Sequence, residues 1–357
     1  MKPIPRLAAL ATLTLTCLGA SAEIVIGASF SITGPAAALG IAPRNAMQLF
    51  PQEIAGEKIR YVVLDDATDP TQAARNAQRL VTEEKVDLII GSTASPPAIA
   101  VAQVATESQT VQLAAAPIDL PDERGQWTYR LPQSIALMAQ GTVEHMKKSG
   151  VRTFGFLGYS DAYGESWLRE MTRYANDAGL KVVGVERFGR ADASVTAQAL
   201  KVLASNPDAM LVVASGSGAV MPQKALVDRG YKGRIYQTFS AVAPDLLRMG
   251  GKDVEGTLGL SGPAVGADQL PDSHPSKPVA LGFIKLYEAK FGAGSYNQFA
   301  ANIWGAKLLL DKAIPVALKQ ARPGTREFRL ALKNAIENSG EVVVPQGVLK
   351  YSATDHY

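Results

Sequence analysis

The chain has 357 residues, of which 47% are hydrophobic and 19% charged. This length allows two domains with separate cores, and the composition is typical of a folded globular protein rather than a disordered or membrane-embedded one. The formal net charge is only +3, and no dense cluster of Lys and Arg with interleaved aromatic residues occurs. The sequence therefore gives no indication of a nucleic-acid partner.

The first 22 residues have the pattern of a signal peptide. Lys2 and Arg6 precede an apolar stretch at 7–18, which is too short to span a bilayer. Small residues at 20–22 supply a cleavage pattern, so we predict cleavage after Ala22 and secretion to the periplasm. Loss of this segment reduces the basic residues from 36 to 34, against 33 acidic ones.

The single cysteine, Cys17, lies inside this segment. The residues before it, 14–16, match a lipoprotein signal poorly, so we predict plain secretion rather than lipid anchoring. The mature chain then contains no cysteine, which excludes disulfides, cysteine nucleophiles and cysteine-ligated metals.

Strands and helices alternate along the first third of the mature chain. This alternation predicts a parallel sheet with right-handed crossovers. We expect strands at 24–28, 60–64, 88–90 and 111–115, and helices at 36–50, from 70 onward, and at 95–108.

The stretch 87–119 carries the strongest local signal. An apolar strand ends at Gly91, and Ser95 is predicted to cap the next helix, with Pro96 at its first position. Ligands of open parallel sheets bind outside the carboxyl ends of the strands, and a helix start favours an anion. The alternative is that this is an ordinary strand–helix–strand loop that binds nothing.

Three acidic residues follow the second strand, at Asp65, Asp66 and Asp69. Their spacing lacks the glycine and glutamate of a calcium loop. We predict that Asp69 caps the following helix, with Pro70 at its first position, and that Asp65 and Asp66 are polar residues at the end of the strand.

A second series of alternating elements predicts a second lobe of the same build. Later helices are expected at 278–291, 298–319 and 325–338 and are predicted to return to the first lobe. In the second series we expect strands at 153–158, 181–188, 209–214 and 234–238, and helices at 165–178, 195–204 and 221–229. Gly179 is expected to end the first of these helices.

Three motifs, at 31–35, 65–70 and 90–95, have the spacing seen in the leucine-isoleucine-valine-binding protein family. The chain from Glu23 onward resembles these type I periplasmic binding proteins of ABC importers. The resemblance implies an α/β fold of two Rossmann-like lobes, each a parallel sheet flanked by helices. Three crossover strands would join the lobes, at 130–134, 262–263 and 342–345.

The resemblance also implies the domain boundaries. Lobe I would comprise 23–132 and 263–343, and lobe II 133–262 and 344–357. The family continues past this point with a glycine turn and a final strand, whereas this chain stops at Tyr357. We therefore expect the C-terminal end of lobe II to be incomplete.

The family binds its ligand between the lobes. Ser95 matches the serine that meets a ligand carboxylate with its hydroxyl and N–H, although it could be an N-cap alone. Ala115, Ala116 and Pro117 match a second lobe I loop, where backbone groups meet the ligand. Leu39 matches a position that lines the cleft, with core packing as the alternative.

Lobe II is expected to contribute four further positions. Tyr163 matches the tyrosine of the family's Tyr-Gly motif, with packing at a helix start as the alternative. Ser215 and Gly216 fall where the family has an aromatic wall residue. Phe239 falls near the glutamate that binds a ligand ammonium.

No catalytic pattern stands out. His145, His274 and His356 lie far apart in the sequence, and no serine lies in a Gly-x-Ser-x-Gly elbow. We therefore predict a binding protein with no enzymatic activity, no cofactor and no metal. A secreted hydrolase and a ligand-sensing receptor domain of the same fold remain alternatives.

The predicted ligand class depends on the residue at the position where the family binds the ammonium group of its ligand. Burying an ammonium without an anionic partner is costly, and Phe239 stands near the family's glutamate. The resemblance also implies a threonine that helps to bind an α-amino acid. That position falls near Asp119, and no threonine is evident there. We predict a small carboxylate, most favourably an aromatic acid of the benzoate or phenylpropanoid kind, delivered by a monomer to an ABC permease. Branched-chain amino acids are the alternative, if Asp161 or Asp119 reaches the site.

Overall fold

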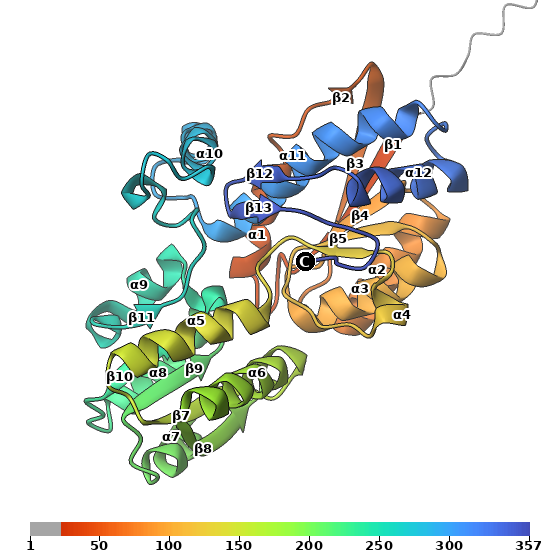
Figure 1. Cartoon of the computed structure of the whole chain (residues 1–357). Coiled ribbons are helices and arrows are strands. Elements are labelled where there is room, and N and C mark those ends of the chain that lie inside the picture. The colour runs from red at the N-terminus through yellow and green to blue at the C-terminus, as the bar shows by residue number, and fades with distance from the viewer. Residues whose placement is uncertain (1–22) are drawn as a thin grey trace, which may run out of the picture.

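The computed structural model describes residues 23–357. It contains two α/β lobes that lie side by side (Figure 1). The predicted signal peptide, 1–22, lies outside the described residues. Within 23–357, no helix has both the length and the apolarity needed to cross a membrane.

The first lobe is built on a six-stranded sheet with the order β2-β3-β1-β4-β5-β6. All neighbours are parallel except β2 and β3, which pair antiparallel. The strands are β1 (Ile24–Phe30), β2 (Glu53–Ile54), β3 (Glu57–Asp65), β4 (Leu88–Gly91), β5 (Val111–Ala114) and β6 (Thr128–Arg130). The helices are α1 (Ala38–Met47), α2 (Pro70–Thr82), α3 (Ser95–Glu107), α4 (Asp122–Gly125), α10 (Ser276–Phe291), α11 (Gln298–Leu318) and α12 (Arg326–Glu337).

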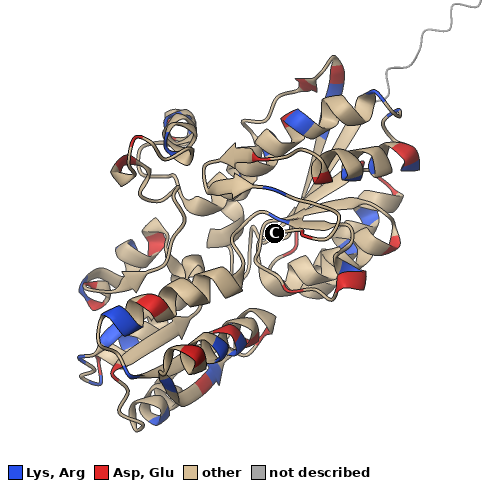
Figure 2. Ribbon diagram, in the orientation of Figure 1, with Lys and Arg blue, Asp and Glu red and all other residues tan. Residues whose placement is uncertain are grey.

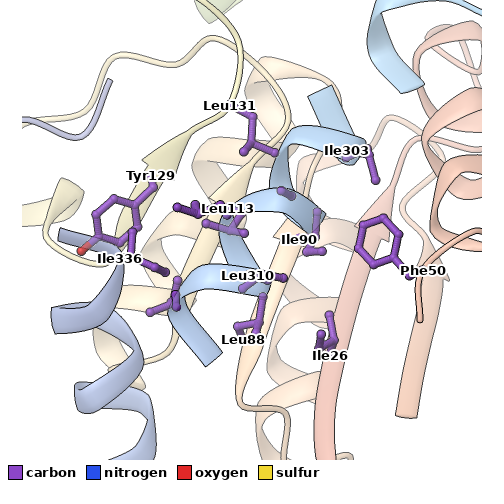
Figure 3. Close-up of a cluster of buried hydrophobic side chains, with 14 of the residues drawn as sticks. Ile26, Phe50, Leu88, Ile90, Leu113, Tyr129, Leu131, Ile303, Leu310 and Ile336 are labelled. Carbon is purple, nitrogen blue, oxygen red and sulfur yellow. The ribbon is translucent and has the colours of Figure 1, made fainter. Parts of the chain in front are cut away.

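The two faces of this sheet are covered by different helices. Ile26, Leu88 and Ile90 point to one face, where they pack with Ile303 of α11 and Ile336 of α12 (Figure 3). Apolar residues of α2 and α3 cover the other face. Because both faces are buried, strands β1 and β4 at the centre of the sheet are largely apolar, as the sequence predicted.

The second lobe has a five-stranded, wholly parallel sheet with the order β11-β10-β9-β7-β8. Its strands are β7 (Thr153–Tyr159), β8 (Lys181–Phe188), β9 (Ala209–Val213), β10 (Arg234–Gln237) and β11 (Leu258–Gly259). Its helices are α5 (Ile135–Lys148), α6 (Ala162–Ala178), α7 (Thr196–Leu203), α8 (Val220–Val227) and α9 (Pro244–Gly250). Short 3₁₀ helices lie at η1 (Gly216–Ala219), η2 (Phe239–Ala241), η3 (Gly251–Val254) and η4 (Ala267–Gln269).

Helix boundaries follow the predicted caps in two clear cases. The Asp69 carboxylate accepts a hydrogen bond from the Gln72 N–H at 2.7 Å and caps α2. Gly179 ends α6 in the left-handed conformation, with φ of 79°. Both predictions are confirmed.

The chain passes between the lobes where the first two crossings were predicted. Leu131 packs in the core of the first lobe and Ile135 in that of the second. On the return, Leu260 packs against the second core, whereas Ala264 belongs to the first.

The third predicted crossing has a different course. Residues 342–349 form an antiparallel hairpin of β12 (Val342–Val344) and β13 (Gly347–Leu349), and Gln133 Nε2 donates to the Gln346 carbonyl beside it at 2.7 Å. Tyr351 then enters the core of the first lobe, and its hydroxyl donates to the Arg130 carbonyl at 2.7 Å. The assignment of 344–357 to lobe II was therefore wrong for the end of the chain, because apolar and aromatic side chains bury it against lobe I.

Candidate functional site

The loops after β1, β3 and β4 meet at one buried carboxylate. Asp66 accepts hydrogen bonds from the hydroxyls of Ser29 at 3.0 Å, Ser31 at 2.7 Å and Ser92 at 2.7 Å. Burial raises the pKa of Asp66, although these hydrogen bonds act in the opposite direction. One side chain thus fixes the carboxyl ends of three neighbouring strands.

Asp65 organises the more exposed part of the same edge. Its carboxylate accepts bonds from the N–H groups of Ile32 and Thr33, from the Thr33 hydroxyl and from the Ala67 N–H. Burial acts to raise the pKa of Asp65, but the hydrogen bonds together outweigh it and lower the pKa. Both carboxylates are therefore structural supports of the loops, beyond the strand-end role predicted for them.

Ser95 has a different local role from the one predicted. The N-cap of α3 is Ala94, and Ser95 is the first helical residue. Its hydroxyl donates to the Pro117 carbonyl at 2.9 Å and so ties the two lobe I loops together. Pro96 and Pro97 have no N–H. Of residues 95–97, in the first turn of α3, Ser95 therefore alone offers a backbone N–H to an acceptor outside the helix.

These loops face the second lobe across a narrow pocket. The first lobe lines it with Leu39, Thr93, Ala94, Ser95, Ala115 and Pro117, the second with Tyr163, Arg190, Ser215, Phe239 and Ser240, and α11 with Phe299. Seven of the nine predicted site residues thus lie around one cavity. That they contact a ligand stays a prediction.

The two remaining predicted residues, Ala116 and Gly216, are buried but do not line this cavity. Gly216 has φ of 51° and lies against α1 of the other lobe, since an added β-carbon would come within 2.9 Å of the Ala38 β-carbon. The lobes therefore approach closely beside the pocket. The cavity volume is about 10 Å³, close to the least that holds one water, so a ring-sized ligand needs the walls to separate.

Beside the buried hydroxyls of the second lobe, the pocket has an aromatic pair formed by Phe239 of that lobe and Phe299 of α11. The rings of Phe239 and Phe299 meet edge to face with centroids 5.7 Å apart. The Tyr163 hydroxyl donates to Thr238 Oγ1 at 2.9 Å, and burial raises the pKa of Tyr163, which keeps the phenol neutral. The wall is therefore apolar around the rings and uncharged at the tyrosine.

Five lining residues were not among the predicted site residues: Thr93, Ala94, Arg190, Ser240 and Phe299. Arg190 lies just after the carboxyl end of the parallel strand β8. The same position after a strand was the reason for predicting that the other loops bind a ligand. Phe299 reaches the pocket from the start of α11, where the Asn297 side chain accepts from its N–H at 3.1 Å. Nothing local in the sequence marks that position.

Charged residues of both signs are interspersed over the two lobes (Figure 2). One ion pair joins the lobes outside the pocket: Arg169 of α6 lies 2.5 Å from Asp119, in the loop after β5. Both side chains are substantially exposed, at 55% and 40%. Within residues 23–357, no group of three or more His, Cys, Asp or Glu side chains is placed to hold a metal ion.

A family model described as "Periplasmic binding protein" matches residues 23–357. The chain belongs to this family. A curated relative, the Leu/Ile/Val-binding protein homolog 7 of Brucella abortus (strain 2308), is 25% identical over 320 residues, which cover 82% of this chain and 77% of the relative. The predicted likeness to the Leu/Ile/Val-binding class of type I periplasmic binding proteins is thus confirmed.

Solved structures agree with this assignment. An extracellular ligand-binding receptor from Rhodopseudomonas palustris HaA2 is 46% identical, with a TM-score of 0.92 and 94% coverage of both chains. An R. palustris solute-binding protein in complex with benzoate is 19% identical, with a TM-score of 0.79 and coverage of 93% of this chain and 90% of that one; it shares the fold. Periplasmic binding proteins act outside the cytoplasm, bind small molecules and work with ABC transporters.

Proposed function

We propose that this periplasmic binding protein captures a small aromatic carboxylate between its lobes and, as a monomer in the periplasm, delivers it to an ABC import permease. The observation that carries this proposal is the makeup of the pocket. Its lining holds an aromatic pair, several hydroxyls and one arginine, and none of its residues is acidic. The aromatic pair suits a ring, the Ser95 N–H and the hydroxyls suit its carboxylate, and an α-ammonium would have no acidic partner among the lining residues.

The two acidic residues that could have served an amino acid are engaged elsewhere. Asp161 caps α6 by accepting from the N–H of Tyr163 and is 2.6 Å from Arg190. Asp119 pairs with Arg169 outside the pocket. Neither lines the cavity, which weighs against branched-chain amino acids as ligands.

The same lining argues against catalysis. Among its residues there is no histidine, aspartate or glutamate to act as general acid or base. Binding without turnover is the function that this set of side chains supports.

A thermal-shift screen tests the ligand class. We expect benzoates and cinnamates to raise the melting temperature, and leucine, isoleucine and valine to leave it unchanged. A ligand at about 100 times its Kd adds about 2.7 kcal/mol to the free energy of unfolding, which is readily detected. Stabilisation by the branched-chain amino acids alone would overturn the proposal, and so would release of a chemically altered product.

Replacing Ser95 with alanine is expected to weaken binding of the best acid from this screen by about 5- to 150-fold, or about 1–3 kcal/mol. The change removes the hydroxyl that ties Pro117 to α3 and lines the pocket. Calorimetric titration measures the affinity. Thr325→Ala is the matched control, because Thr325 is a true N-cap in the same lobe, on α12, far along the chain. It should lower stability by about 1 kcal/mol and leave the affinity unchanged.

The ion pair between the lobes is expected to contribute modestly to closure. For Asp119→Asn we expect the Kd of the same acid to rise by no more than about fivefold at low salt, because an exposed pair contributes about 0.2–1 kcal/mol. The difference should disappear at about 1 M salt, where the Debye length is about 3 Å. Asp245→Asn, which removes an exposed pair with Arg248 inside one lobe, is the control. An equal effect of both substitutions would contradict a role in closure.

A further inference from the structure

Arg190 is the only charged residue among those that line the pocket. It lies on the wall contributed by the second lobe, whereas Ser95 and Pro117 lie on the wall of the first. The rings of Phe239 and Phe299 line the same cavity. The pocket therefore has polar groups on two facing walls and an aromatic pair beside them.

The Arg190 guanidinium is fixed on three sides. Its Nε lies 2.6 Å from the Asp161 carboxylate, its Nη1 donates to the Ser215 hydroxyl at 3.0 Å, and its carbon lies 4.1 Å from the centre of the Tyr159 ring. The side chain is 12% exposed. Among the described residues 23–357, the hydrogen bonds of the guanidinium are made by Nε and Nη1, and none is made by Nη2. A donor on a group held so rigidly loses little entropy when a ligand atom accepts from it.

The charge of Arg190 is already balanced. Asp161 is itself held in place, since its other oxygen accepts from the N–H groups of Tyr163 at 3.0 Å and Gly164 at 3.3 Å. A second carboxylate at this wall would face that aspartate, which disfavours it. A neutral oxygen that accepts from the guanidinium suits the site better, and the hydroxyls of Ser215 and Ser240 line the wall beside it.

We propose that Arg190 recognises a hydroxyl on the ligand ring, on the side away from the carboxylate, so that the protein selects hydroxylated aromatic acids. This rests on the proposed function. The carboxylate occupies the Ser95 side, the ring lies against Phe239 and Phe299, and the ring oxygen accepts from Arg190. Serine hydroxyls of the same wall can accept the proton of that phenol. A ligand with two polar ends contacts both lobes at once and therefore favours the closed arrangement.

Paired titrations test the proposal. The probes are 4-hydroxybenzoate against benzoate and 4-hydroxycinnamate against cinnamate, measured by calorimetry on the wild-type mature protein. We expect the hydroxylated member of the pair that binds to be at least about tenfold tighter, as for a hydrogen bond to a charged donor. Equal affinities within the pair would overturn the proposal and leave the proposed function standing. If none of the four acids binds, the proposed function fails as well.

Two variants assign the preference to Arg190. Arg190→Lys keeps the charge beside Asp161, and therefore the fold, but loses the planar fork of donors. We expect it to abolish the preference by weakening the hydroxylated acid about tenfold, while the parent acid changes less than about twofold. Arg187→Gln is the matched control, because Arg187 forms an exposed pair with Glu165 and does not line the pocket. If Arg190→Lys weakens both acids equally, Arg190 only maintains the structure of the pocket wall, and the proposal is wrong.

Discussion

Gly91→Ala is expected to lower the free energy of unfolding by more than about 3 kcal/mol. Gly91 ends β4 with φ of 116°, a conformation that residues with a side chain rarely adopt. An added β-carbon would also collide with the Ser29 carbonyl oxygen of β1. Because that contact is with backbone in the middle of the sheet, relief requires the two strands to shift. Urea unfolding of the mature protein measures the loss.

Gly56→Ala separates collision from backbone strain. Gly56 has φ of 86°, and an added β-carbon there has no neighbour within 4 Å. Gly56→Ala should lower the free energy of unfolding by about 1–2 kcal/mol, the usual strain of a residue with a side chain in the left-handed conformation. Similar losses for both variants would show that the close approach at Gly91 contributes nothing beyond the backbone conformation.

Much of the fold was predictable because its signals are local. The apolar strands at 88–90 and 209–214 have helices on both sides of them in the sequence, which is the pattern of a parallel sheet. Asp69 with Pro70, and Gly179 after a helical stretch, marked a start and an end that the structure confirms. Helix α9 and strand β11 had no comparable signal and were not predicted.

The wrong predictions concern residues whose positions are decided by contacts with residues far away in the sequence. Ser95 was expected to cap α3, but the helix begins one residue earlier and the hydroxyl bonds instead to Pro117, 22 residues away. The end of the chain was assigned to lobe II by resemblance. Burial of Tyr351 beside Tyr129 keeps it on lobe I.

The predicted site residues came together because most of them follow strands of parallel sheets, whose carboxyl ends share one edge. Arg190 also follows such a strand but matches no family position that the resemblance supplied. Its surroundings come from Asp161, Ser215 and Tyr159, which lie 25 to 31 residues away along the chain, so only the folded structure brings them together.

Asp66→Ala is expected to cost about 4 kcal/mol of unfolding free energy, because three buried serine hydroxyls lose the charged acceptor that they share. Asp66→Asn keeps the shape and one carbonyl oxygen, and serine hydroxyls can rotate to accept from the new amide. We therefore expect it to cost less than half as much. Equal losses for the two variants in urea unfolding would mean that the carboxylate charge, rather than the hydrogen-bonding shape, holds the loops.

The pH dependence of stability has a definite sign at this residue. Burial raises the pKa of Asp66 in the folded state above the value of about 3.9 that an unfolded chain has. The folded state therefore binds this proton more tightly, and the contribution of Asp66 to stability falls as pH rises from about 4 through the folded-state pKa. Asp66→Asn cannot titrate, so the free energy of unfolding of the wild type relative to this variant should decrease over that interval. A wild-type advantage that instead grows with pH would show that the hydrogen bonds of the three serines outweigh burial and lower the pKa.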